Sequence, residues 1–171
     1  MKVYLAARYS IKDDIKAKGE ELAELGIEST SRWCHEKVKG SAQLDDVPPS
    51  FLLSAAINDL EDIKRANCVV MFSVNPREAT VRGGRHWEAG YAYGLGKPLI
   101  ICGPEENIFH MLPDVVVCED WEKTKKELLR RRFEQSRERS SWDTIGFTGS
   151  QIGCRQSSSS ARSNSILPTS Y

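Results

Sequence analysis

The chain has 171 residues, enough for one domain with a substantial hydrophobic core. Its 24 basic and 24 acidic side chains cancel, so its charge gives no reason to expect a nucleic-acid polymer or an anionic membrane as a partner. No apolar run approaches the roughly 20 residues that cross a bilayer, and no cleavable signal precedes the first apolar segment, so we expect a cytoplasmic protein.

Strand and helix signals alternate along the first half of the chain. An apolar strand is expected at residues 2–7, a helix at residues 11–25 and a second strand at residues 27–33. The polar stretch that continues through residue 49 is too long for a simple turn and is a candidate lid over a substrate. A helix capped by Ser50 is expected to run to residue 67. Its inward stripe is expected to consist of Leu53, Ala56, Leu60 and Ile63.

The second half continues the alternation. The unbroken apolar run at residues 68–72 is typical of a central parallel strand that is covered on both faces. A helix introduced by glycines follows at residues 83–96, and short apolar strands are expected at residues 99–102 and 115–118. A last helix is expected at residues 121–133. This order predicts an α/β fold with a doubly wound sheet of about five mostly parallel strands.

The character of the sequence changes near its end. Residues 134–171 are serine-rich and lose the apolar periodicity, so we expect a disordered tail after a single α/β domain at residues 1–133. The composition of the tail gives no reason to assign chemistry to it.

The five cysteines contain no Cys-x-x-Cys pair and are expected to be buried, reduced thiols. Cys34 and His35 have no second pair of ligands at metal-binding spacing, and His86 and His110 stand alone in the sequence. We therefore expect neither a metal nor a cofactor.

The candidate binding residues are those that follow the strands, because ligands of open α/β sheets bind beyond the carboxyl ends of the strands. This rule selects Ala7, Arg8 and Tyr9 after the first strand, Ser73 with its loop after the third, and residues 83–88, which include Gly83, Gly84 and Arg85. Two carboxylates can converge on the same edge: Asp59, from the helix before the third strand, and Glu88, from the helix after it.

Both carboxylates have a functional and a structural interpretation. Glu88 is expected in the first turn of its helix, where the helix dipole favours the ionised form that a nucleophile needs. Acidic residues are also common in first turns because they stabilise the helix. Asp59 is expected at the edge of the buried stripe, although most carboxylates on helices are solvated.

Four segments together carry a resemblance to a known family. They are Val3-Tyr4-Leu5-Ala6-Ala7, Asn58-Asp59-Leu60 with Ile63 and Ala66-Asn67-Cys68-Val69-Val70, Gly84-Arg85-His86-Trp87-Glu88-Ala89-Gly90-Tyr91-Ala92, and Gly96-Lys97-Pro98. In this order, over about residues 1–121, the chain resembles the nucleoside 2-deoxyribosyltransferase family, including its relatives that hydrolyse deoxynucleoside monophosphates.

The resemblance implies a flavodoxin-like (Rossmann-like) sheet in which Glu88 is the nucleophile, and Asp59 and Tyr4 match two further residues of the family site. Glu88 would capture the deoxyribosyl group, Asp59 would donate a proton to the leaving base, and Tyr4 would orient Glu88. Tyr4 could equally be an ordinary buried strand residue. The implied ligands are a small-molecule nucleoside or nucleotide and a nucleobase. Family members often form homo-oligomers whose chain ends complete a neighbouring site, but this tail offers no clear counterpart.

Transfer and hydrolysis remain open as outcomes. Arg82 and Arg85 flank Gly83-Gly84, and exposed amides at a helix start bind anions, so a 5′-phosphate could be held there; solvated arginines are the alternative. A nucleotide substrate would favour a 2′-deoxynucleoside 5′-monophosphate N-glycosidase.

A catalytically silent nucleotide-binding module on the same fold is the alternative from another class. A dinucleotide-binding oxidoreductase is disfavoured because no Gly-x-Gly-x-x-Gly follows the first strand. Candidate surfaces for stacking a base, each of which could be ordinary packing, are Trp33, Trp87 and Phe109.

Overall fold

The computed structural model describes residues 1–36, 47–75 and 83–144, and for residues 138–144 it describes the backbone alone. Most of the candidate lid, Arg82 and residues 145–171 of the expected tail lie outside the described residues. None of the helices in the described ranges is long and apolar enough to cross a membrane.

All five strands lie in one parallel sheet with the order β2-β1-β3-β4-β5. The strands are β1 (Lys2–Ala6), β2 (Glu28–Ser29), β3 (Cys68–Phe72), β4 (Leu99–Cys102) and β5 (Val115–Cys118). This order is that of flavodoxin-like sheets, in which the topology reverses between β1 and β3. The structure therefore confirms the predicted doubly wound parallel sheet.

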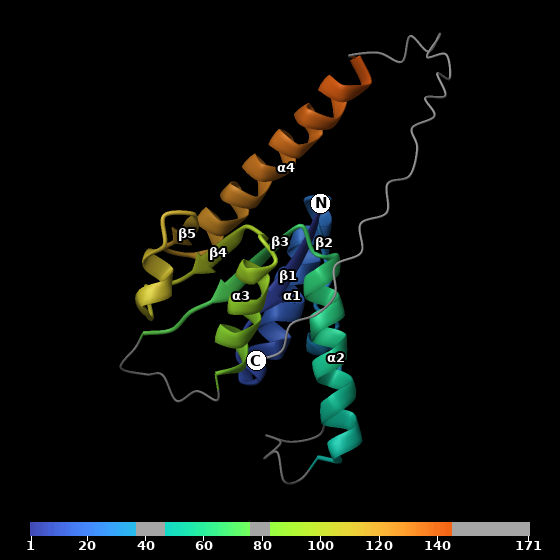
Figure 1. Ribbon diagram of the computed structural model, residues 1–171, viewed down its shortest axis with the longest axis vertical. Coiled ribbons are helices and arrows are strands. Elements are labelled where there is room, and N and C mark those ends of the chain that lie inside the picture. Colours follow the sequence, from blue (N-terminus) through green and yellow to red (C-terminus); the bar gives the residue numbers. More distant parts are fainter. Residues whose placement is uncertain (37–46, 76–82, 145–171) are drawn as a thin grey trace, which may run out of the picture.

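Helices cover both faces of the sheet (Figure 1). The helices are α1 (Lys12–Glu24), α2 (Pro49–Arg65), α3 (Gly84–Gly94) and α4 (Trp121–Thr144). The helices α2 and α3 pack together on one face. The other two are joined where Glu21 of α1 accepts hydrogen bonds from Trp121 Nε1 at 2.9 Å and Lys125 Nζ at 2.8 Å. Short 3-10 helices complete the fold: η1 (Tyr9–Ile11), η2 (Arg32–His35) and η5 (Ile108–Met111).

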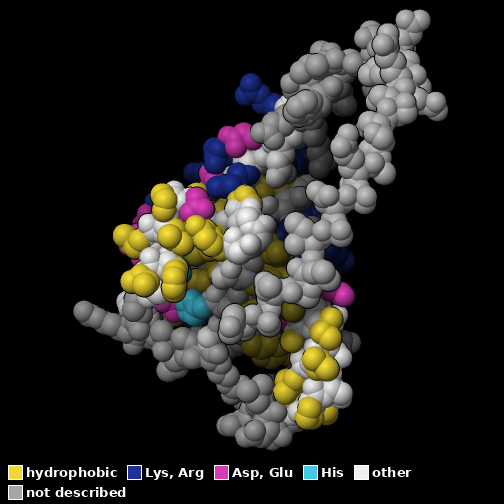
Figure 2. All heavy atoms as spheres, viewed as in Figure 1, with side chains coloured by type: hydrophobic (Ala, Val, Ile, Leu, Met, Phe, Trp, Pro, Cys, Tyr) yellow, Lys and Arg dark blue, Asp and Glu magenta, His cyan; other side chains and the backbone are white. Residues whose placement is uncertain are grey.

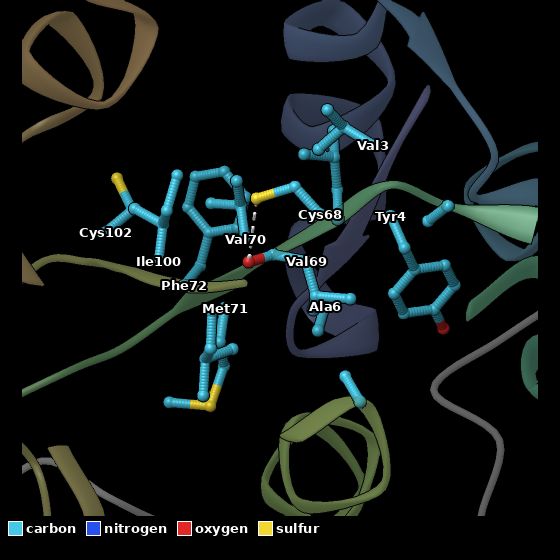
Figure 3. Packing of buried hydrophobic residues seen from close by; sticks show 14 of the residues in the cluster. Val3, Tyr4, Ala6, Cys68, Val69, Val70, Met71, Phe72, Ile100 and Cys102 are labelled. Atoms are coloured by element: carbon cyan, nitrogen blue, oxygen red, sulfur yellow. Dashed lines mark hydrogen bonds between the residues drawn. The ribbon is translucent and has the colours of Figure 1, made fainter. Parts of the chain in front are cut away.

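The two central strands supply the core. All five residues of β3 are buried, as expected for its continuous apolar run. Tyr4 pairs with Val69 and Ala6 with Met71, and these side chains point to the face that α3 covers, as Figure 3 shows. Tyr4 thus brings a hydroxyl into an otherwise apolar layer, which requires a polar partner from the helices above it.

The cysteines of the described part lie in this core. Cys34, Cys68, Cys102 and Cys118 are buried with free thiols, as expected, and Cys154 lies outside the described residues. Burial raises the pKa of the Cys68 thiol to about 12.

Three expected boundaries were wrong. The strand expected at residues 27–33 contains only Glu28–Ser29, because η2 begins at Arg32 and is bonded to α2. Ser50 does not cap α2: Pro48 is the N-cap, and the helix begins at Pro49, whose pyrrolidine ring suits the first helical position. The last helix does not end at residue 133 but continues to Thr144, because charged pairs such as Arg130 with Glu127 and Glu134 support its exposed turns.

The inward stripe of α2 was also predicted wrongly. Leu53 is 63% exposed and Ala56 is exposed, whereas Ile63 is buried as expected. The face that meets the sheet carries two acidic residues, Asp59 and Asp62, which find polar partners there. Pairing of these carboxyl groups therefore rotates the apolar residues of the first turns outward, and Figure 2 shows them as a hydrophobic patch over α2.

Candidate active site

Tyr4 is the centre of the candidate site. It is fully buried on β1, and its hydroxyl donates a hydrogen bond to Oε1 of Glu88 at 3.1 Å. Burial raises the pKa of Tyr4 far above its usual range, and the nearby charges of Glu88 and Asp59 add to the shift. The phenol is therefore a proton donor that stays protonated.

Glu88 lies deeper in its helix than expected. The helix α3 begins at Gly84, after Gly83 in the left-handed conformation (φ 81°), so no acidic residue lies in its first turn. Burial and the charge of Asp59 raise the pKa of Glu88 to about 7, against the hydrogen bond from Tyr4. The expected position in the first turn is therefore wrong, and burial is the main influence on the pKa of Glu88.

Asp59 reaches the same place from α2. Burial, followed by the charges of Glu36 and Asp62, raises the pKa of Asp59 to about 7. A hydrogen bond with Tyr4 and the charge of Arg32 oppose the shift. The structure thus brings Tyr4, Glu88 and Asp59 together as a partly buried carboxyl pair joined through one phenol.

The predicted binding residues after the strands have different surroundings. Ala7 and Arg8 follow β1, and Arg8 Nε is buried without a hydrogen-bond partner among the described residues. Ser73 donates instead to the backbone carbonyl of Pro104 at 2.6 Å, which ties the end of β3 to the loop after β4. Gly83 and Gly84 face open space in the described part of the chain, since no atom beyond their chain neighbours and the helix backbone lies within 4 Å of the position a Cβ would occupy.

Arg85 turns away from these residues. Its side chain is 1% exposed and forms an ion pair with Glu106, whose side chain is 4% exposed. Burial raises the pKa of Glu106, but the hydrogen bond and charge of Arg85 outweigh burial and lower it overall. His86 Nε2 lies 3.3 Å from the same carboxylate, and the backbone N–H of Glu106 donates to Nδ1 of His110 at 3.1 Å.

This network corrects the interpretation of the two histidines as isolated. They meet because the loop after β4 folds over the start of α3 and presents Glu106 to both. Within the described residues, no group of three or more His, Cys, Asp or Glu side chains is placed to hold a metal ion.

The three aromatic candidates for base stacking differ in how far they are exposed. Trp33 is 8% exposed and donates Nε1–H to the Leu5 carbonyl at 3.0 Å, so it belongs to the core. Trp87 is 61% exposed and stacks on Tyr91 with ring centroids 5.5 Å apart. Phe109 is 66% exposed on η5.

Sequence reasoning missed the residues that surround Asp59. They are Glu36 at the end of η2, Arg32 within it and Asp62 one turn along α2. The available signal was the spacing of Asp59 and Asp62, which places both on one helix face beside the apolar Ile63.

A cavity of about 280 Å³ lies elsewhere, at the amino end of β4, where Lys97, Pro98, Asp114 and Arg131 line it. That edge of the sheet is opposite the carboxyl ends at which ligands of this topology bind. The buried carboxyl pair, and not this cavity, is therefore the candidate active site.

The fold and the site define a flavodoxin-like α/β protein with a buried pair of carboxyl groups. No protein-family model and no curated protein sequence matches the chain. Among solved structures, it is similar to a 2-deoxyribosyltransferase from Bacillus psychrosaccharolyticus, with a TM-score of 0.55 and 23% identity over 73% of this chain and 90% of that one.

Two further structures are similar. A conserved protein from Enterococcus faecalis V583 gives a TM-score of 0.54 and 15% identity over 77% of this chain and 98% of that one. The CMP N-glycosidase BcmB of Clostridium botulinum gives a TM-score of 0.46 and 22% identity over 77% of this chain and 97% of that one. The first two likenesses show that the chain has the fold of a 2-deoxyribosyltransferase, which confirms the predicted fold class.

Proposed function

We propose that this chain is a nucleoside 2-deoxyribosyltransferase, an enzyme that cleaves the N-glycosidic bond of a 2′-deoxynucleoside and transfers the deoxyribosyl group to another nucleobase. The observation that carries the proposal is the Tyr4 hydroxyl bonded to Glu88 in a buried setting that also holds Asp59. Carboxyl groups with pKa values near 7 are suited to nucleophilic and acid–base roles at neutral pH.

In the proposed reaction, a carboxylate oxygen of Glu88 attacks C1′ of the sugar while the bond from C1′ to the base nitrogen breaks. The electron pair of that bond leaves with the base, and Asp59 gives the base a proton. Glu88 then carries the deoxyribosyl group as an ester. A nitrogen of a second base attacks C1′, releases Glu88 and returns a proton to Asp59, so the two displacements retain the configuration.

The hydrogen bonds of Tyr4 bear on the protonation of both carboxyl groups. A phenol has a single O–H to donate, and Tyr4 directs it to Glu88. This hydrogen bond favours the ionised form of Glu88, which a nucleophile requires. Burial and the charges of Glu36 and Asp62 favour the neutral form of Asp59, which an acid requires, against its hydrogen bond with Tyr4.

The substrate is proposed to lie beyond the carboxyl ends of β1 and β3, against Ala7, Arg8 and the backbone of Gly83 and Gly84. Open space at both glycines supports this placement. Ser73 and Arg85 are bonded to the loop after β4, so in this arrangement they support the site from behind.

The test of the proposal is product analysis. Incubation of the protein with deoxyinosine and free adenine is expected to give deoxyadenosine and hypoxanthine. A 2-fluoro-2-deoxy nucleoside analogue is expected to leave a sugar adduct on the peptide that carries Glu88, which mass spectrometry detects. Neither product nor adduct would form if the chain were a binding module without turnover.

A second candidate, a 2′-deoxynucleoside 5′-monophosphate N-glycosidase, is favoured by Arg8. Its Nε, which is buried and has no hydrogen-bond partner within the described ranges, could donate to a 5′-phosphate beside the site. In that reaction water replaces the second base, and a deoxynucleotide incubated alone would yield free base and deoxyribose 5-phosphate.

Tyr4→Phe is expected to lower kcat about 10- to 100-fold, since it removes the group that orients Glu88. Loss of the Tyr4 hydrogen bond also raises the pKa of Glu88 further, so the acidic limb of the pH–rate profile should move to higher pH. Steady-state kinetics across pH would measure both changes.

Tyr93→Phe is the matched control for Tyr4→Phe. The Tyr93 hydroxyl donates to Asp114 at the same distance, 3.1 Å, but at the surface. This variant should retain wild-type rates. Equal rate losses in the two variants would contradict the assigned role of Tyr4.

We also propose that the protein is a cytoplasmic homo-oligomer. Exposed apolar side chains on α2 and α3, including Leu53, Ile57 and Trp87, support self-association. Light scattering would measure the oligomeric state.

A further inference from the structure

Asp62 is a carboxylate with no exposed surface and three hydrogen-bonding partners. It accepts hydrogen bonds from the backbone N–H of Arg32 at 3.0 Å and from Arg32 Nε at 2.8 Å, and it forms an ion pair with Arg65. The hydroxyl of Thr30 donates to its backbone carbonyl at 3.0 Å. Asp62 therefore fixes the segment that follows β2 to α2.

Arg32 extends the attachment along α2 on both sides of Asp59. Its Nη2 donates to the Asn58 carbonyl at 3.2 Å and to Glu61 Oε2 at 3.2 Å. The guanidinium therefore holds the residue before Asp59 as well as the turn after it. Because α2 buries few apolar side chains on this face, these polar contacts determine which side of the helix meets β1 and Tyr4.

We propose that Asp62 is a positioning residue which, together with Arg32, orients Asp59 toward Tyr4 and sets the electric field at the Asp59 carboxyl group. The inference deepens the proposed function, since it concerns the group assigned as the proton donor. Asp62 touches no substrate in this proposal and acts only through Asp59.

Within the described residues, titratable and charged groups face Asp59 from four elements. Glu36 and Arg32 belong to the η2 segment, Asp62 to α2, Tyr4 to β1 and Glu88 to α3. The charge of Asp62 favours the neutral form of Asp59, and the charge of Arg32 favours the ionised form. The two partners of one ion pair thus act on Asp59 in opposite directions.

This opposition gives a test that a purely structural role would fail. Carbon-13 NMR of the full chain labelled in its aspartate carboxyl groups follows the titration of Asp59, whose resonance is the one missing from Asp59→Asn. In Asp62→Asn two guanidinium groups remain without their carboxylate, so the midpoint of Asp59 should fall by about one pH unit. In Arg32→Gln the midpoint should rise by about half a pH unit.

Shifts of opposite sign would support the proposal, whereas unchanged midpoints or shifts of the same sign would overturn it. If Asp62→Asn does not fold, Arg32→Gln decides alone, because the Arg32 side chain is 46% exposed and Arg65 still pairs with Asp62. A rise then supports the proposal, and no change or a fall overturns it. The titration requires no turnover, so its result is independent of whether the chain cleaves nucleosides.

Discussion

Glu88→Gln is expected to abolish turnover and, above about pH 7, to increase the free energy of unfolding. Glutamine keeps the shape of the side chain but cannot attack C1′, so kcat should fall at least about 1,000-fold. The gain in stability arises because the folded protein holds Glu88 at a pKa of about 7, well above the value of about 4.3 in an unfolded chain.

The sign of the pH dependence follows from this difference. Between the two pKa values the folded protein binds more protons at Glu88 than the unfolded chain does, so the stability of the wild type falls as pH rises through this window. Above about pH 7 the loss is complete, and it amounts to about 3 kcal/mol. Glu88→Gln removes the titrating group and should not show this loss.

Urea denaturation of both proteins at pH 5 and pH 8 would measure the effect. The matched control is Glu20→Gln, a change at an exposed carboxylate of α1, which should leave the rate and the pH dependence of stability unchanged. A Glu88→Gln variant that retains turnover, or that loses stability with pH in parallel with the wild type, would contradict the assignment.

The opposite effects on stability and activity have one physical origin. Desolvation makes Glu88 costly to ionise in the folded protein, and the same desolvation removes the water that would otherwise shield its charge from a developing sugar cation. At this position a change that increases the free energy of unfolding therefore lowers activity, as is common at catalytic sites.

The sheet could be predicted from sequence because each strand has a local signature. The runs at β3 and β4 are apolar without interruption, and such runs identify buried parallel strands wherever they occur in the chain. The convergence of Asp59 and Glu88 followed from topology, since both flank β3. Their pKa values did not follow, because burial depends on the whole fold.

The helix α2 shows where local patterns are insufficient. Its apolar residues favour one orientation, but Asp59 and Asp62 have partners on β1 and η2 that lie far away in the sequence. Those partners decide the rotation of the helix, and they leave Leu53 exposed. The direction of the Arg85 side chain could not be predicted for the same reason, because its partner Glu106 belongs to a loop 21 residues later in the chain.

Glu106→Gln is expected to destabilise the fold by about 3–5 kcal/mol, because it leaves the guanidinium of Arg85 buried without a counter-charge. The Nε and Nη1 of Arg85 already lack hydrogen-bond partners among the residues that the structure describes, so the loss of Glu106 leaves more of the guanidinium unpaired. The carboxylate also receives the backbone N–H of Val74 at 3.4 Å, so its loss loosens the end of β3 as well as the start of α3.

The control for Glu106→Gln is Glu28→Gln, which removes one partner of an exposed ion pair. Lys2 and Glu28 approach to 3.4 Å with side chains 45% and 61% exposed, and such pairs contribute about 1 kcal/mol or less. Urea denaturation should therefore separate the two variants by at least about 2 kcal/mol. Similar free energies of unfolding would mean that the burial of Arg85 does not depend on the charge of Glu106.

The double change Arg85→Met with Glu106→Leu should recover most of the stability that Glu106→Gln loses, since it removes both charges from the interior.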